Sequence, residues 1–244
     1  MKNLAKITAV EAKLFYREPG TWIVAVLLPT IILVVIGVLF APHRPDEYLG
    51  GKRFIDLFAP SLVVITLATL GVNTLPARLV SYREKGVLRR LSTTPADPAT
   101  LLAVQLGINM IMAVAAVSLL ITVGNLAFQI PLPQHPFGFL AAFLLGMSSL
   151  FALGLLVAAV APNARASAAF IVVLFVLVMF LGGVYVPRLF LPEFLIRLGD
   201  YTPPGVQALL DAWMGSAPQP LQLAALGAIT LAAGVAAARW FRWE

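Results

Sequence analysis

The chain has no cysteine, and over one long stretch it has no charge either. The missing cysteines exclude disulfides, thiolate nucleophiles and cysteine metal ligands. From Pro98 to Ala164 there is no Asp, Glu, Lys or Arg, and His135 is the one titratable side chain. A bilayer core about 30 Å thick is crossed by roughly 20 apolar residues in a helix, so this stretch predicts two membrane spans. The prolines of residues 131–136 predict the turn between them.

Groups that perform catalysis or couple transport to ions are also scarce. Both histidines, His43 and His135, fall in predicted loops, and no predicted span has a carboxylate in its interior. Proton-coupled or sodium-coupled transport normally needs such a group inside the bundle, so it is disfavoured. No serine in a predicted span has a base beside it, so we expect no catalytic residue and no metal site. A membrane-embedded lipid-modifying enzyme is the alternative of a different class.

A phosphate-binding loop is missing as well. No G-x-x-x-x-G-K-[ST] sequence occurs, because the Gly-Gly-Lys of residues 50–52 lacks the upstream glycine and the hydroxyl residue. The chain therefore does not hold ATP by this motif, and we expect no cofactor in it.

What the chain does contain is mostly apolar. Hydrophobic residues make up 60% of it and charged residues 11%, against about 25% charged in an ordinary soluble domain. Uncharged apolar runs predict an all-α polytopic membrane protein with six transmembrane helices in a single domain, residues 1–244. The spans are expected near residues 21–41, 57–77, 100–128, 137–161, 166–186 and 219–238.

Lysine and arginine are distributed unevenly between the predicted sides of the membrane. With a cytoplasmic N-terminus, twelve fall in the inner segments and five in the outer segments. The positive-inside rule then places both termini in the cytoplasm, in what we expect to be a bacterial plasma membrane. Because this orientation signal accounts for the net charge of +6, we expect no nucleic-acid partner.

Two polar segments on the predicted inner side have amphipathic patterns. In residues 1–18, four cations share one helical face and four aliphatic residues another, which predicts a helix lying on the inner leaflet. In the loop of residues 78–95, apolar residues recur at helical spacing, which predicts one or two short helices broken near Gly86. Such a helix can dock on a cytoplasmic partner. The alternative is a charged loop that only sets the topology.

The outer loop after the fifth predicted span has a pattern of its own. Four apolar residues between positions 191 and 198 recur at helical spacing, and Thr202 and Pro203 predict the N-cap and first turn of a second short helix. We expect this pair to re-enter the outer leaflet and to gate release, because water would penalise the apolar faces. The predicted outer gate comprises Pro187, Phe194, Leu198 and Pro203.

Polar residues inside the spans are few and uncharged. Asn73 and Asn109 are candidates to contact cargo along a translocation path, and the alternative is that they only bond neighbouring helices. Small residues recur at four-residue spacing in two spans, between Gly138 and Ala158 and between Ala224 and Ala236. This spacing lets backbones approach closely, so both helices are predicted to be scaffold rather than pore.

Taken in order, these features resemble the membrane subunit of the ABC-2 family of ATP-binding-cassette exporters nearly end to end. An amphipathic N-terminal helix comes first, and the first inner loop and the end of the fifth span follow the family pattern. The motifs that carry the resemblance are Arg17-Glu18-Pro19, Pro29, residues 83–88 (Arg-Glu-Lys-Gly-Val-Leu), Leu91, Thr94-Pro95, the glycines before Pro187, Leu191-Pro192 and Thr202-Pro203.

The resemblance implies a permease half that is driven by a separate ATPase. The implied partners are two copies of a cytoplasmic ABC ATPase, a second permease copy or a close relative, and membrane lipid. ATP and Mg would be held by the ATPase. The residues that the resemblance assigns to ATPase coupling are Arg83, Glu84, Lys85, Gly86, Leu88, Arg89 and Leu91.

The resemblance implies several classes of cargo, since the family exports drugs, antibiotics, lipids and lipid-linked polysaccharides. A wide sugar channel is expected to have aromatic platforms, whereas these spans are mainly Leu, Val, Ala and Ile. We therefore expect a lipophilic drug, antibiotic or lipid-like cargo. Export of a lipid-linked polysaccharide or teichoic acid is the alternative.

Overall fold

Every regular element in the described part of the chain is a helix, which confirms the all-α class. The computed structural model describes residues 2–17, 19–40, 51, 53–87, 90, 98–186 and 190–241, and no strand occurs among them. The elements are α1 (Lys2–Arg17), α2 (Pro19–Phe40), α3 (Phe54–Ala68), η2 (Thr69–Thr74), α4 (Leu75–Glu84), α6 (Pro98–Phe128), α7 (Pro136–Val160), α8 (Ala164–Leu181), α9 (Glu193–Asp200), α10 (Val206–Met214) and α11 (Pro220–Trp240).

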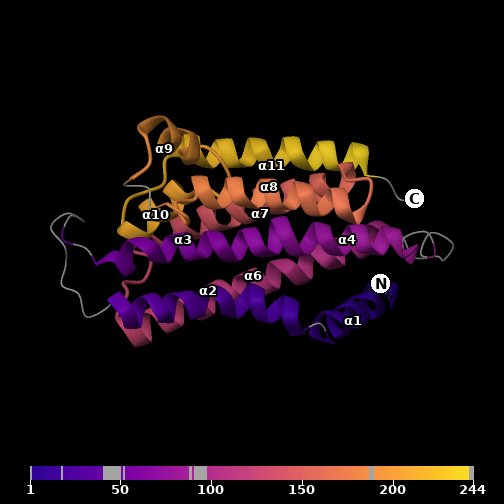
Figure 1. Ribbon diagram of the computed structural model, residues 1–244, viewed down its shortest axis with the longest axis horizontal. Helices are drawn as coiled ribbons and strands as arrows, with labels where there is room; N and C mark the ends of the chain where they lie inside the picture. Colours follow the sequence, from indigo (N-terminus) through magenta and orange to yellow (C-terminus); the bar gives the residue numbers. More distant parts are fainter. Residues whose placement is uncertain are drawn as a thin grey trace.

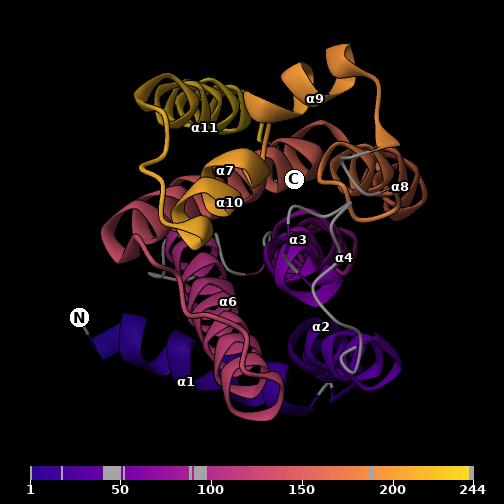
Figure 2. The ribbon, with the colours of Figure 1, turned by 90° about the vertical axis from the view of Figure 1, so that its left-hand side faces the viewer.

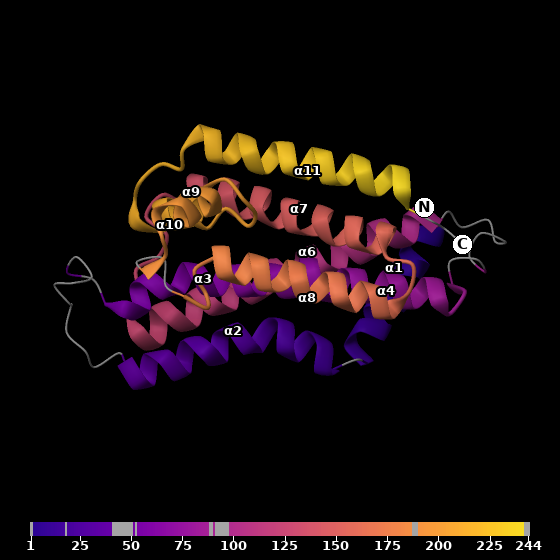
Figure 3. The ribbon, with the colours of Figure 1, turned by 45° about the horizontal axis from the view of Figure 1, so that its top comes forward.

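The long helices run side by side as a bundle, and the short helices mark its two ends (Figure 1). At one end lie α9, α10 and the beginning of α3. At the other end lie α1, the end of α4 and the end of α11 (Figure 3). We call these the α9 end and the α1 end.

The continuous helix made by α3, η2 and α4 is the centre of the bundle. In the view along the bundle, α2, α6, α7 and α8 lie around it (Figure 2). Of the most apolar stretch in Phe54–Glu84, 83% is buried, against 28% in Ala164–Leu181 and 22% in Pro220–Trp240. A helix that is apolar all round belongs in an interior, whereas the peripheral helices leave apolar faces uncovered for lipid.

Within the described residues, five helices are long and apolar enough to cross a membrane, and each coincides with a predicted span: Phe54–Glu84, Thr100–Phe128, Pro136–Val160, Ala164–Leu181 and Pro220–Trp240. The apolar stretch of α2, Ile23–Leu39, is shorter. The whole of α2 has 22 residues, which extend about 33 Å, so the six-span layout stays a prediction. The second span is longer than predicted, because α4 continues it to Glu84 with Leu79 and Val80 buried.

Two glycines let the backbone of α7 lie directly against the backbone of neighbouring segments. A Cβ on Gly154 would lie 1.9 Å from the carbonyl oxygen of Gly71 in η2. A Cβ on Gly146 would lie 2.2 Å from the carbonyl oxygen of Pro204. No side chain fits at such distances, so the close approach predicted from the small residues of this span is confirmed.

The same prediction is wrong for α11. This helix packs on α7, but its buried residues are Gln222, Leu226, Ala233 and Ala237. Along the predicted stripe, Ala224, Ala228 and Ala232 are exposed. Their spacing is the same as in α7, but they lie on the face turned away from the bundle, and spacing alone does not say which face is covered.

The second outer helix begins later than predicted. α10 starts at Val206 with Gly205 as its N-cap in the left-handed region, at φ 75°. Thr202 lies in the preceding turn, where its hydroxyl donates to the carbonyl of Gly199 at 3.4 Å. The prediction of Thr202 as N-cap and Pro203 in the first turn is therefore wrong. A positive φ is adopted readily by glycine and rarely by threonine, which explains why the cap falls at residue 205.

Candidate translocation path and coupling site

The segment η2 turns one polar side chain of the central helix outward. From Thr69 to Thr74 the helix widens to the π form, and the Thr74 hydroxyl donates to the Thr69 carbonyl at 3.0 Å. Gly71 and Val72 are buried, whereas Asn73 is exposed. π segments within long helices are frequent at functional sites because they shift the register of the side chains.

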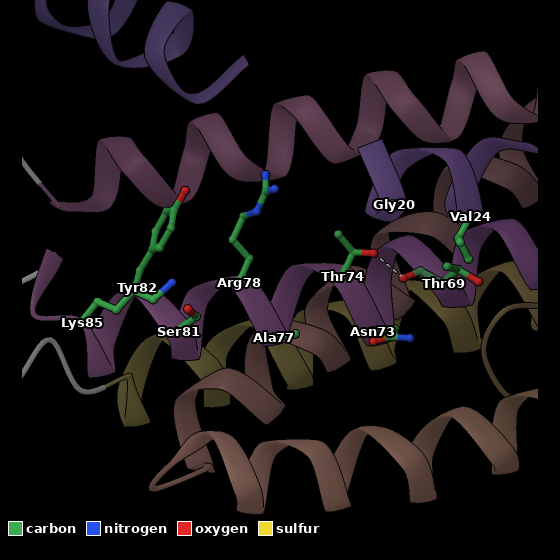
Figure 4. A pocket seen from close by; sticks show the side chains of 10 residues that line it. All are labelled: Gly20, Val24, Thr69, Asn73, Thr74, Ala77, Arg78, Ser81, Tyr82 and Lys85. Carbon is green, nitrogen blue, oxygen red and sulfur yellow. Dashed lines mark hydrogen bonds between the residues drawn. The ribbon is translucent and has the colours of Figure 1, made fainter. Parts of the chain in front are cut away.

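Asn73 and Ala77 lie between two grooves. The first, which we call the α2 groove, has a volume of about 560 Å³ and lies between the start of α2 and the central helix (Figure 4). The second, the α8 groove, has a volume of about 260 Å³ and is lined by Ser167 and Ile171 of α8 on its other side. Asn73 and Ala77 line both. The central helix is therefore open on the side that faces the space between α2 and α8.

The second candidate for cargo contact, Asn109, lies elsewhere. It is fully buried in α6, and its amide donates to the carbonyl of Gln105 at 2.8 Å. It is absent from the lining of both grooves. Of the two asparagines, only Asn73 is on a surface that a solute reaches.

Arg83 and Glu84, at the end of α4, bond the connection between α7 and α8. The Arg83 guanidinium donates to the carbonyl of Ala158 at 3.1 Å and also to that of Ala161, at the end of α7. The Glu84 carboxylate accepts from the amide of Ala164, the first residue of α8, at 2.7 Å. A cation suits the carbonyl end of a helix and an anion suits the amide end, so both charges match the helix dipoles.

The next two residues of the predicted coupling segment, Lys85 and Gly86, follow the end of α4. Lys85 is exposed, and Gly86 has φ 66°, which breaks the helix at the predicted place. Arg90 donates its backbone amide to the carbonyl of Gly86 at 3.0 Å. The other residues assigned to coupling, Leu88, Arg89 and Leu91, lie outside the described residues.

A buried polar cluster joins α1 to α4 and α6. Glu11 is 6% exposed, and its Oε2 accepts from the Tyr82 hydroxyl at 2.8 Å and from the Gln105 amide. Phe15, one turn further on, packs beneath the Arg78 guanidinium at 5.0 Å from its ring centroid. Val10 and Leu14 are exposed beside this contact, as expected for a helix that also meets lipid.

Sequence reasoning missed this cluster. The available signal was that Glu11 is the one acid in Lys2–Arg17 and lies at helical spacing from Phe15, on the apolar side of the helix. Gln105 stands in an uncharged run and gave no signal of its own. The cluster fixes the end of α4 to α1 and α6, directly before the segment predicted to meet the ATPase.

The predicted outer gate is divided between a buried and an exposed part. Pro203 is buried, whereas Phe194 and Leu198 on α9 are 69% and 52% exposed. Glu193 and Arg197 form an ion pair at 2.6 Å on the same helix, also exposed. Pro187 lies outside the described residues. The α9 face is thus uncovered by the bundle itself, in contrast to α10, which buries Leu209 and Trp213.

The described side chains on this side of the bundle form two grooves and a set of contacts between helices. No group of three or more His, Cys, Asp or Glu side chains among them gathers as metal ligands. Such an arrangement suits passage of a solute along the central helix and transmission of movement from α4. Together with the five long apolar helices of the described residues, these features are those of a polytopic helical membrane protein.

Comparison with known families then identifies the chain as a member of the ABC-2 type transporter family, whose model matches residues 3–204. It is therefore a permease component of an ABC transporter, and the family generally works with an ATPase subunit. The match includes α1 to α9 and ends before α10 and α11. Comparison with curated proteins and with solved structures gave no significant match.

Proposed function

We propose that the chain is the permease half of an ATP-driven exporter for a lipophilic, drug-like or lipid-like cargo. The observation that carries this proposal is the open side of the central helix, where Asn73 stands between α2 and α8. A path on this side needs a second wall, which a second permease copy or a close relative would supply. The protein would then lie in a bacterial plasma membrane with the α1 end in the cytoplasm.

The driving force would come from two copies of an ABC ATPase, which would hold ATP and Mg. They would contact the segment that starts at Lys85, next to the bonds from Arg83 and Glu84 to the α7–α8 connection. Closure of the ATPase pair would push on α4, and α7 and α8 would move with it. Because α8 lines the second groove, such movement would change the path beside Asn73.

Transport in proteoliposomes tests this function. The chain would be reconstituted with its partner ABC ATPase, and ATP-dependent export of a lipophilic dye would be measured. Asn73→Leu should reduce export severalfold while the ATPase still co-purifies. Thr122→Leu is the matched control, since Thr122 is exposed on α6 and lines neither groove. Equal export by wild type and Asn73→Leu would contradict the assigned path.

A further inference from the structure

One wall of the α8 groove carries a buried hydroxyl without a hydrogen-bond partner. Ser167 lies in the first turn of α8, is 1% exposed and lines the groove. Its backbone amide donates to the carbonyl of Asn163 at 2.9 Å. Its Oγ, in contrast, has no hydrogen-bond partner in the part of the chain that the structure describes. Buried polar groups are normally bonded, so an unpartnered hydroxyl on the wall of a groove points to a ligand that bonds it there.

Three threonine hydroxyls elsewhere in the long helices bond their own helix. Those of Thr66, Thr122 and Thr230 donate to the carbonyl four residues earlier, at 3.1, 2.7 and 2.7 Å. Ser167 makes no such bond to the carbonyl of Asn163. The Thr30 hydroxyl also lacks a partner among the described residues, but Thr30 lines neither groove. Ser167 therefore differs from all four in being both unpartnered and next to an open space.

Asn73 supplies a second polar group on the opposite wall of the α8 groove. It is exposed on the π segment η2, which packs beside α8 together with α4. An amide side chain both donates and accepts hydrogen bonds, as does a hydroxyl. The other described lining residues are alanine, valine or isoleucine. The groove thus offers two hydrogen-bonding side chains on an otherwise apolar surface.

The α8 groove is too small for a whole drug-sized molecule. Its volume of about 260 Å³ lies below the roughly 300–1,000 Å³ of pockets that enclose such ligands. Val172, which lines the groove, and Val176, one turn further along α8, are 60% and 47% exposed. Residues four apart lie on the same side of a helix, so these two side chains continue an apolar face beyond the groove. The groove therefore suits a polar headgroup, and the face beyond it suits an aliphatic chain.

We propose that the α8 groove binds an amphiphile whose headgroup carries an ester or amide carbonyl next to a hydroxyl, as in a monoacylglycerol. Ser167 donates its hydroxyl to the carbonyl oxygen of the ligand, and the Asn73 amide bonds the ligand hydroxyl. The aliphatic chain lies along Val172 and Val176. This inference rests on the proposed function, because the groove belongs to the proposed path. It narrows the cargo from lipophilic compounds in general to amphiphiles with such a headgroup.

Photocrosslinking tests the proposal on the full chain, purified into phosphatidylcholine nanodiscs without ATPase or ATP. The probe is a monoacylglycerol with a photoactivatable group in its acyl chain, and crosslinked peptides are identified by mass spectrometry. Crosslinks should fall within residues 73–80 and 164–176. The methyl ester of the same acyl chain keeps the carbonyl but has no hydroxyl, and it should label these segments about fivefold less, as expected for one lost hydrogen bond. Labelling of α11, which has exposed residues along its length, corrects for the amount of each probe in the bilayer.

Two variants and a control locate the contact. Ser167→Ala removes only the hydroxyl, and it should lower labelling by the monoacylglycerol about fivefold, the size expected for one hydrogen bond. Ala168→Trp keeps both polar groups but fills the groove from an exposed lining position, and it should abolish labelling of the two segments. Ser118→Ala is the matched control, since Ser118 is exposed on α6 and lines neither groove. It should leave labelling unchanged.

The proposal would be overturned by equal labelling with both probes, or by labelling that survives both Ser167→Ala and Ala168→Trp. Absence of labelling in the two segments, as expected if a second copy of the chain covers the groove, would overturn it as well. Because the measurement involves no transport, it is separate from the function proposed above. A permease that is labelled in the groove but exports nothing with its ATPase would contradict that function and leave the binding site standing.

Discussion

The two ends of the central helix each place an arginine on the carbonyl end of a neighbouring helix, but they balance its charge differently. At the α9 end, Arg53 donates to the carbonyls of Phe128, the last residue of α6, and of Gln129, at 2.9 and 3.2 Å. Its charge is balanced within its own turn by Asp56 at 2.7 Å. The hydrogen bonds that Arg53 donates to the Asp56 carboxylate raise the pKa of Arg53.

At the α1 end, Arg83 and Glu84 are neighbours in the chain but bond different helices. Arg83 bonds the end of α7 and Glu84 the start of α8. The arginine contact at the α9 end therefore joins the central helix to one neighbour, whereas the Arg83 and Glu84 contacts at the α1 end join it to the connection between two helices. We infer that the first contact fixes the bundle and that the second transmits movement to it.

The largest loss of stability is expected between the two ends of the central helix, where η2 packs on α7. Gly154→Ala would place a methyl group 1.9 Å from the Gly71 carbonyl oxygen, and we expect a loss of stability of about 3 kcal/mol from overpacking. Gly234→Ala is the matched control, because a Cβ there meets nothing within 4 Å. Thermal unfolding in detergent would compare them. Equal stability of the two variants would show that α7 does not pack on η2 as described.

At the α1 end, Glu84→Lys should cause the greatest loss of transport. The change removes the hydrogen bond to Ala164 and puts a cation at the amide end of α8, at a cost of about 1–2 kcal/mol. Membrane insertion should persist while export and stimulated ATP turnover fall. Wild-type turnover and co-purification with the ATPase would contradict the coupling role of this segment.

A matched pair of arginine variants tests whether the contacts at the two ends of the central helix have different roles. Arg53→Gln and Arg83→Gln should each lower stability by about 1–3 kcal/mol, because each leaves carbonyls without a charged donor. Only Arg83→Gln should also uncouple ATP turnover from export. If Arg53→Gln uncouples them to the same extent, the two ends do not differ in the way we infer.

A smaller loss of export is expected from changes on the exposed face of α9. Phe194→Asp combined with Leu198→Asp would put two charges on a face predicted to meet the outer leaflet. The cost is roughly 2.5–3.5 kcal/mol each at a bilayer centre and less near the interface. Export should fall while the ATPase remains bound, and a binding assay run beside the transport assay would separate the two. Full export by the double variant would show that α9 is a solvated connection and does not enter the outer leaflet.

The sequence was sufficient to predict the long helices, because a run of about 20 uncharged residues has few alternatives to a span. It also predicted the break in the helix at Gly86 and the close approach of the α7 backbone to its neighbours. It was insufficient for α11, where the small residues have the same spacing but face away from the bundle. It also misplaced the start of α10, since a left-handed cap at Gly205 leaves only a weak trace in sequence.

The sequence predicted only part of the candidate site. Asn73 and Asn109 look alike in sequence, and only the π turn at η2 distinguishes the exposed one from the buried one. Arg83 and Glu84 were assigned to a partner by resemblance, but their bonds to α7 and α8 join residues about 80 positions apart. Such long-range pairs are set by tertiary packing, which no local pattern encodes.

Thiol labelling at the open side of the central helix tests most directly whether movement of α4 reaches the path. The native chain has no cysteine, so Asn73→Cys provides a single reporter in the permease reconstituted with its ATPase. Labelling by a water-soluble maleimide should change severalfold between the nucleotide-free and ATP-bound states, and this change should disappear when Glu84→Lys is added. Equal labelling in both states, in a complex that still exports, would contradict the account.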